Sequence, residues 1–380
     1  MNRLTRTAVT SALAVALGLC LTACTTSSSP APTSTASAAS GSATPAAPTG
    51  RTHFAPSDLT WQPADEVKVT LADGSSSGGS GVSVSGSTVT ITAAGVYRVT
   101  GSLSNGQLAV AVPSDAAAVV VLDQVTITNS AGPAVSVTSG DKVTLVLADG
   151  TTSTLTDGTG YQVPNDATPV AAVASASDLT IAGRGSLKVT GSTNDAISTR
   201  DGLVIASGTI QATAQDDGIR GKDYVDILDG DITVQAAGDA ISSDNVKEAD
   251  RGWLRIAGGT TTITGSKEGL EAKAVTISGG TVSITATDDG ISASAGTSDG
   301  SQDDGSLVTI SGGTVTIKAG SDGIDSNGRV ELTGGTITIT SATGAATGPV
   351  DANGPITLSG ATLTANGTPI TSVDQLKKKR

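Results

Sequence analysis

The stretch TISGGTVSITATDDGIS, residues 276–292, contains the pattern that decides the fold. On both sides of its Gly-Gly pair, β-branched residues alternate with polar ones, which is typical of two short strands separated by a tight corner. An Asp-Asp-Gly-Ile segment follows, and the same order of segments returns along the chain. The sequence is therefore a repeat, and its period indicates the architecture.

The units of the repeat align on the apolar residue that follows Asp-Gly or a related pair. Intervals of 22, 22, 29, 21 and 33 residues separate the aligned positions, and the two longest intervals contain inserted polar segments. The aligned residues are Ile197, Ile219, Ile241, Leu270, Ile291, Ile324 and, with a weaker match, Val350.

Each unit supplies two alternating runs and a third, shorter run at Asp-Gly-Ile. Three short strands and three corners in about 22 residues predict one coil of an all-β solenoid, a parallel β-helix whose inward Ile and Val side chains stack along the axis. An antiparallel sandwich or a propeller is the alternative, and the absence of two-residue hairpin connectors argues against it.

The chain divides into five predicted segments. Arg3 and Arg6 precede an apolar run too short to span a membrane, and LTAC at 21–24 matches a lipoprotein cleavage site that would leave lipid on Cys24. An ordinary signal peptide is the alternative. The predicted segments are a lipoprotein signal peptide (1–23), a disordered tether rich in Ser, Thr, Pro and Ala (24–58), irregular coils with an N-terminal cap (59–178), the regular β-helix (179–370) and a basic tail (371–380).

The composition narrows the classes of function. Lys and Arg number 22 against 35 Asp and Glu, a net charge of −13, which argues against nucleic-acid binding. With one histidine, His53, and no thiol beyond Cys24 after cleavage, zinc and copper sites are not expected either. We expect a protein held by lipid at the extracellular face of the cell membrane.

Acidic residues recur at one phase of the repeat. In stacked coils ~4.8 Å apart these carboxylates form a column, and neighbours repel by about 1 kcal/mol in water and about 3 kcal/mol at an effective dielectric of 20. A calcium ion, which prefers oxygen ligands and tolerates irregular geometry, would offset this repulsion. The alternative is ordinary Asp-Gly turn chemistry, with each carboxylate bonded to its own backbone. The predicted calcium ligands are Asp195, Asp216, Asp217, Asp239, Asp288, Asp289 and Asp322, and Glu268 shares their phase.

Basic and aromatic residues follow the acids at the next corner. Because sugars present apolar C–H faces and polar hydroxyl or carboxylate groups, aromatic rings beside bases predict a carbohydrate groove. The alternative is that the two rings cover the flank of the β-helix beneath the loop at 244–252. The predicted groove consists of Arg200, Lys222, Tyr224, Arg251 and Trp253.

Three blocks in this order carry a resemblance to a known family. They are ITAAGVYRVTGSLSNGQLAVAV (91–112), DKVTLVLADGTTSTLTD (141–157) and the segment 178–223, followed by the ISGGTVSITATDDGI units. The chain resembles bacterial carbohydrate-binding-domain proteins with a polysaccharide-lyase-like β-helix, over roughly residues 64–365. The resemblance implies a right-handed parallel β-helix, bound calcium and non-catalytic binding of cellulose or acidic glycans such as polygalacturonate.

Two other classes of function stay open at this point. A calcium-dependent polysaccharide lyase would use an arginine to remove a proton from the sugar, and Arg200 and Arg220 lie near the acids. A non-catalytic adhesin would use calcium only to stabilise the solenoid. The sequence predicts no catalytic residue and leaves the oligomeric state undetermined.

Overall fold

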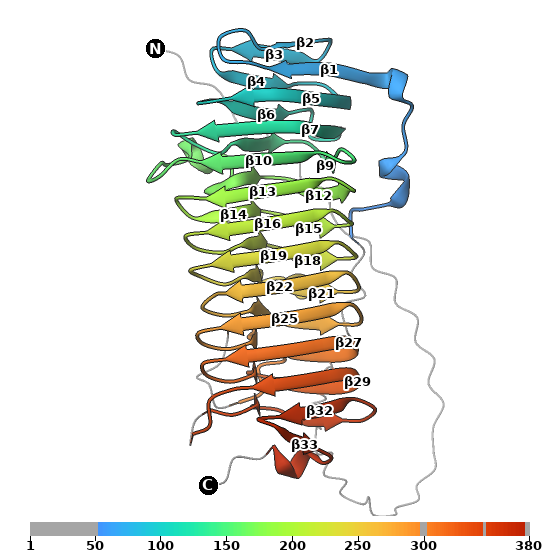
Figure 1. Cartoon of the computed structure of the whole chain (residues 1–380), viewed down its shortest axis with the longest axis vertical. Coiled ribbons are helices and arrows are strands. Elements are labelled where there is room, and N and C mark those ends of the chain that lie inside the picture. Colours follow the sequence, from blue (N-terminus) through green and yellow to red (C-terminus); the bar gives the residue numbers. More distant parts are fainter. Residues whose placement is uncertain (1–51, 297–301, 345–346, 377–380) are drawn as a thin grey trace, which may run out of the picture. The chain divides into compact units, whose positions relative to one another are not determined.

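The computed structural model describes residues 52–296, 302–344 and 347–376. The predicted signal peptide, Cys24 and the tether up to residue 51 lie outside the described residues. Figure 1 shows the described strands stacked as successive coils, each lying directly above the next. Equivalent strands of neighbouring coils pair in parallel, which confirms the predicted parallel β-helix.

Most coils contribute one strand to each of three ladders. Ladder 1 contains β9 (Lys142–Leu147), β12 (Asp178–Gly183), β15 (Gly202–Ile205), β18 (Tyr224–Ile227), β21 (Trp253–Ile256), β24 (Ala274–Ile277) and β31 (Ile356–Leu358). Ladder 2 contains β10 (Thr152–Asp157), β13 (Ser186–Gly191), β16 (Thr209–Ala214), β19 (Asp231–Ala236), β22 (Thr260–Gly265), β25 (Thr281–Ala286) and β32 (Thr362–Ala365). The strands that bend from ladder 1 into ladder 2 are β5 (Gly95–Leu103), β7 (Ala117–Asn129), β27 (Leu307–Ala319) and β29 (Arg329–Thr340).

Ladder 3 is built from shorter strands, and from β14 (Asp195–Thr199) onward these are the strands that the Asp-Gly-Ile segments and their variants predict. It contains β4 (Thr88–Ile91), β6 (Gln107–Ala111), β8 (Val135–Ser139), β11 (Ala171–Ser175), β14 (Asp195–Thr199), β17 (Ile219–Gly221), β20 (Ile241–Ser243), β23 (Leu270–Ala272), β26 (Ile291–Ala293), β28 (Ile324–Ser326) and β30 (Val350–Ala352).

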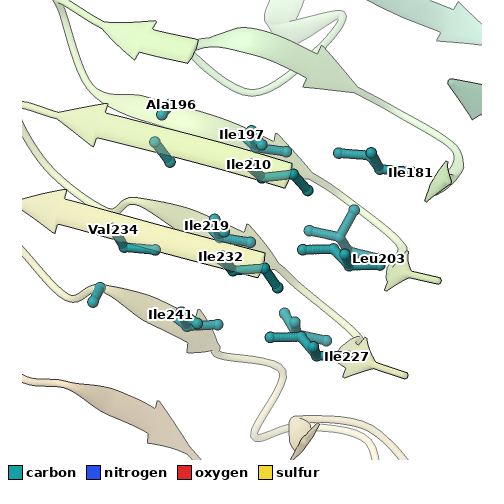
Figure 2. Close-up of a cluster of buried hydrophobic side chains, with 14 of the residues drawn as sticks. Ile181, Ala196, Ile197, Leu203, Ile210, Ile219, Ile227, Ile232, Val234 and Ile241 are labelled. Carbon is teal, nitrogen blue, oxygen red and sulfur yellow. The ribbon is translucent and has the colours of Figure 1, made fainter. Parts of the chain in front are cut away.

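The axial core confirms the alignment of the repeat. Ile197, Ile219 and Ile241 are direct partners on successive strands of ladder 3, and the same register continues to Val350. All three isoleucines are fully buried. Figure 2 shows them facing side chains of the other ladders, including Leu203 of ladder 1. Because every coil buries the same kind of residue at the same phase, the coils share one continuous apolar core.

Glycine pairs form the corner between ladders 1 and 2, as predicted. The second glycine of the pair at 279–280 has φ +78°, a left-handed conformation that favours glycine. A Cβ on the first, Gly279, would lie 2.4 Å from the carbonyl oxygen of Ala257 in the coil above. Stacked backbones therefore leave no room for a side chain at this corner.

Antiparallel hairpins cover both ends of the stack. At the N-terminal end β2 (Ser77–Gly78) pairs with β1 (Glu66–Leu71), and β3 (Val82–Ser85) pairs with β4. At the other end β33 (Thr368–Ile370) pairs with β32, and the short helix η4 (Val373–Gln375) follows. Leu376, 5% exposed, joins the core, so the predicted tail boundary at 371 was placed too early. These caps protect strand edges that would otherwise be free to pair with other chains.

A strap, residues 52–65, runs beside ladder 1 with the short helices η1 (Pro56–Leu59) and η2 (Pro63–Asp65) (Figure 1). Lys142 Nζ lies 2.8 Å from Asp58 Oδ1, and Phe54 packs against buried rings of ladder 1. The predicted disordered tether therefore extended too far, because its last residues carry side chains that bind the β-helix. A further short helix, η3 (Pro164–Asp166), lies in the loop before β11. No helix among the described residues has the length and apolar character that a membrane span requires.

Candidate functional site

The predicted column of acids exists at the corner that leads into ladder 3. The Asp217 backbone N–H donates to Asp195 Oδ1 at 3.3 Å, and the Asp239 N–H donates to Asp217 Oδ1 at 2.9 Å. We call this set the acid column; it consists of Asp195, Asp217, Asp239, Glu268, Asp289 and Asp322. The same bond recurs further down, where the Glu268 N–H donates to Asp239 Oδ1 at 3.3 Å and the Asp322 N–H donates to Asp289 Oδ1 at 2.8 Å. Asp195, Asp217, Asp239 and Asp289 thus each accept a backbone N–H from the next coil, a role that neither sequence hypothesis anticipated.

Burial and repulsion between neighbours raise the pKa of five members of the acid column, Asp195, Asp217, Asp239, Glu268 and Asp289. The pKa of Asp195 is raised to about 7, first by burial and then by the charge of Asp217. The pKa of Asp239 is also raised to about 7, by burial and by its neighbour Glu271. Burial likewise raises the pKa of Glu268 and Asp289. The acid column is therefore destabilising when it is fully ionised without a counter-ion.

A second column lies three residues further along each unit, on the outward side of ladder 3. Its members pair directly from coil to coil: Ser198, Arg220, Ser242, Glu271, Ser292, Asp325 and Asp351. The acids of this second column, Glu271, Asp325 and Asp351, were not predicted from the sequence. The position directly after each aligned apolar residue was the signal that would have identified them, because it holds Ser, Arg, Glu or Asp in every unit.

Among the residues that the structure describes, the two columns combine into two clusters of three carboxylates. The first cluster consists of Asp239, Glu268 and Glu271, and the second of Asp322, Asp325 and Asp351. Within each cluster one oxygen per residue lies within 4.8 Å of the others. The pKa of Asp325 is raised to about 7, first by burial and then by neighbouring carboxylates.

Oxygen-only donor sets of this kind fit calcium better than zinc or copper. In the first cluster Glu268 Oε2 is buried and has no hydrogen-bond partner among the described residues, which leaves an acceptor for a cation. Lys267 Nζ lies 3.4 Å from Glu268 Oε1, but this ammonium group is partly exposed, so solvent weakens its compensation of the negative charge of the cluster. Of the residues predicted as ligands, Asp239 and Asp322 belong to these clusters.

The other predicted ligands lie outside the two clusters. Asp195, Asp217 and Asp289 are members of the acid column. Asp216 is exposed and Asp288 is half-buried beside that column.

A cationic pocket of about 310 Å³ opens on ladder 3 at its first regular coils. Arg200, Arg220 and Lys222 line it, together with Asp195 and Asn194. Arg220 Nη2 donates to Asp244 Oδ2, and Arg200 Nη2 donates to the Thr168 carbonyl at 3.2 Å, so both guanidinium groups are held in place. Two of the five predicted sugar-binding residues, Arg200 and Lys222, therefore meet in one cavity.

The two predicted aromatic residues are neighbours but are not exposed. Tyr224 and Trp253 are direct partners on β18 and β21, and their rings stack at 4.6 Å with an interplanar angle of 5°. They are only 3% and 4% exposed. Phe54 packs on them, and the His53 backbone N–H donates to Tyr224 Oη at 2.9 Å. The strap, rather than the loop at 244–252, supplies these contacts, so the rings offer no open face to a sugar in this conformation.

Arg251 pairs with Asp223, with Nη1 3.2 Å from Oδ2. Arg200 and Lys222 line the cationic pocket, and Arg251 is not among its lining residues. The single groove expected from the sequence is therefore divided. Its bases at Arg200 and Lys222 face ladder 3, whereas its rings lie on ladder 1 under the strap.

Comparisons with known proteins agree with this fold. The family model of the carbohydrate-binding domain-containing proteins matches residues 85–352 and 273–375. A carbohydrate-binding domain-containing protein of Acetivibrio thermocellus is 36% identical over 194 residues, which cover 50% of this chain and 68% of the relative. The structure of the polysaccharide lyase-like protein from C. thermocellum, a gadolinium derivative, is similar with a TM-score of 0.53 and 26% identity, over 77% of this chain and 97% of that one. The chain belongs to the family of carbohydrate-binding domain-containing proteins.

Proposed function

We propose that this protein is a calcium-containing, non-catalytic polysaccharide-binding protein that holds acidic glycans, such as polygalacturonate, at the extracellular face of the cell membrane through a lipid on Cys24. The observation that carries the proposal is the cationic pocket, in which three basic side chains converge beside Asp195, the first member of the acid column. Guanidinium and ammonium groups bind the carboxylate of a uronic acid strongly, and bidentate geometry adds specificity.

Two observations support calcium as the bound cation. The carboxylate clusters supply hard oxygen ligands, and burial first, then neighbouring carboxylates, raise the pKa of Asp239, Glu268 and Asp325 among them. The solved relative was studied as a gadolinium derivative, and gadolinium, like calcium, is a hard cation that carboxylates bind. A cation held at Asp239, Glu268 and Glu271 or at Asp322, Asp325 and Asp351 would screen the acidic surface and permit a polyanionic glycan to approach it.

A repeating surface suits a repeating ligand. Because coils present equivalent positions at regular intervals, weak contacts with successive sugars add through multivalency. Arg220 does not support the lyase alternative. Burial lowers the pKa of its guanidinium, but the bond and charge of Asp244 outweigh burial and raise it. A general base has to be unprotonated, and Arg220 is held in the protonated form.

The test replaces the two exposed bases of the cationic pocket. In the Arg200→Ala, Lys222→Ala variant we expect retention on polygalacturonate gel in calcium to weaken at least tenfold, about 1.4 kcal/mol, because two charge-assisted contacts are lost. The matched control is Lys188→Ala, Lys318→Ala, which removes the same charge from exposed positions on ladder 2 strands. Equal retention of both variants would contradict the proposal. Release of unsaturated products, followed by ultraviolet absorbance, would favour a lyase instead.

A further inference from the structure

A second cavity lies between the strap and the first coils of the solenoid. We infer that this cavity, the indole pocket, binds a free α-amino acid with a large apolar side chain. The inference is independent of the proposed glycan binding, because the indole pocket and the cationic pocket have no lining residue in common.

The indole pocket has the size and the apolar lining that an amino acid requires. Its volume is about 420 Å³, within the range of roughly 300–1,000 Å³ typical of small-molecule sites. Trp61 of the strap lines it, together with Val121 and Val146, which are direct partners on β7 and β9. Contact with an indole and two aliphatic side chains removes an apolar side chain of the ligand from water, which is favourable.

The Trp61 ring is held in a fixed orientation. Its Nε1–H donates to Glu66 Oε1 at 2.9 Å. The same carboxylate accepts two hydrogen bonds from Arg98, Nε to Oε2 at 2.6 Å and Nη2 to Oε1 at 2.9 Å. The Arg98 hydrogen bonds are the main reason that the pKa of Glu66 is lowered, so the carboxylate stays ionised and the network stays intact above acidic pH. The indole is thus positioned before any ligand arrives, which reduces the entropy that binding costs.

An exposed pair of opposite charges lies at the rim of the indole pocket. Arg184 Nη2 lies 2.6 Å from Asp149 Oδ2, and the two side chains are 81% and 65% exposed. Because an ion pair as exposed as this contributes little to stability, a ligand can take over either partner. An α-amino acid carries its ammonium and its carboxylate on the same carbon. It can therefore present its carboxylate to Arg184 and its ammonium to Asp149 at the same time, with charge-assisted hydrogen bonds to both.

The second arginine of the indole pocket is already engaged. Arg98 donates to both carboxylate oxygens of Glu66, and its Nη1 lies 3.1 Å from Asp123 Oδ2. The rim pair is therefore the part of the lining that a charged ligand can use. An anion that bound Arg184 alone would leave Asp149 without its partner, and a neutral ligand would form weaker hydrogen bonds with both. The arrangement selects a ligand that carries both charges.

The strap holds the indole in place over the coils. Trp61 lies between η1 and η2, and the strap is fastened on both sides of it, by Asp58 to Lys142 and by Glu66 to Arg98. Without these two ion pairs the indole would have no fixed position over the coils. The Trp61 side chain is nevertheless partly exposed, so its ring is accessible to a ligand.

L-Phenylalanine is the probe for this inference, and N-acetyl-L-phenylalaninamide, which has the same side chain but neither charge, is the comparison ligand. We expect L-phenylalanine to bind the full chain saturably in calorimetry and to change the tryptophan fluorescence, and we expect the blocked ligand to bind about tenfold more weakly or worse. Arg184→Ala weakens L-phenylalanine binding by about fivefold or more, because the ligand carboxylate loses its partner. The matched control is Lys188→Ala, which removes an exposed positive charge from β13 of the same coil, outside the cavity, and leaves binding within about twofold of the wild type.

Trp61→Ala is expected to weaken L-phenylalanine binding about tenfold and to remove the fluorescence change. Arg184→Ala guards against the case in which Trp61→Ala releases the strap, because Arg184 is 81% exposed and its removal leaves the fold intact. The inference is overturned if L-phenylalanine does not bind the wild-type chain, if the blocked ligand binds equally well, or if Arg184→Ala and Lys188→Ala bind L-phenylalanine equally. Trigalacturonate binding is unchanged in Arg184→Ala, since the cationic pocket is untouched, so failure of the glycan proposal and failure of this inference are separate results.

Discussion

Chelation of divalent cations at about pH 7.5 lowers the apparent midpoint of thermal unfolding of the full chain by roughly 6 °C, whereas chelation at about pH 5 has a much smaller effect. A cation present at about 1,000 times its Kd stabilises the folded state by about 4 kcal/mol. For a folded domain of this size, each kcal/mol shifts the midpoint by roughly 1.5 °C. Scanning calorimetry with and without EDTA at the two pH values measures the difference.

The pH dependence follows from the direction of the pKa shifts. The pKa values of Asp195, Asp239 and Asp325 rise from 3.8 to about 7 in the folded chain. Because the folded state then binds more protons than the unfolded state, the stability these groups contribute is complete below about pH 4 and is lost as the pH rises through about 7. A shift of this size corresponds to about 4 kcal/mol per group at most. The metal-free protein is therefore least stable where the carboxylates are ionised, which is also where calcium binds best.

A substitution separates cation binding from other effects of chelation. Asp325→Asn, Asp351→Asn keeps the size of both side chains and removes two charges from the second cluster. We expect this variant to respond less to EDTA than the wild type and, once chelated, to be the more stable of the two at about pH 7.5, because repulsion is relieved. Asp231→Asn, at an exposed position of β19, is the control. Identical EDTA responses in all three proteins would show that the second cluster holds no cation.

The fold could be predicted from the repeat because each unit of the repeat forms one complete coil. Each aligned apolar residue, from Ile197 to Val350, occupies the same place on successive strands, so one correct phase assigns the register of all of ladder 3. The Gly-Gly corners were predictable for the same reason, since a stacked backbone excludes a Cβ wherever the corner recurs. Features that repeat are thus accessible from the sequence alone.

Features that occur once were not accessible. The strap lies in a segment whose composition is that of a disordered tether, and only the contacts of His53, Phe54 and Asp58 with distant strands show that its end is ordered. Those contacts also explain why Tyr224 and Trp253, correctly placed as neighbours, are covered. The acids of the second column repeat only in part, with serine or arginine in other units, and so did not stand out as a ladder.

Arg255→Leu is expected to lower the free energy of unfolding by about 3–5 kcal/mol, a second large effect. Arg255, 33% exposed, donates to Asp226 through Nε at 2.8 Å and through Nη2 at 2.6 Å, whereas the Asp226 side chain is 0% exposed. Removal of the arginine leaves that carboxylate buried without its counter-charge, and an unpaired buried charge costs more than the pair contributes. Urea denaturation monitored by far-ultraviolet circular dichroism measures the change.

The double variant Asp226→Val, Arg255→Leu tests this reason directly. Asp226 pairs with Val204 on the preceding strand, so a valine at 226 extends an existing apolar contact and the double variant regains most of the lost stability. The exposed pair Arg184–Asp149 is the control, and Arg184→Leu costs less than about 1 kcal/mol because both partners stay hydrated. If the double variant were as unstable as Arg255→Leu alone, the cost would come from lost packing of the arginine stem. In that case the buried charge of Asp226 would have no part in it.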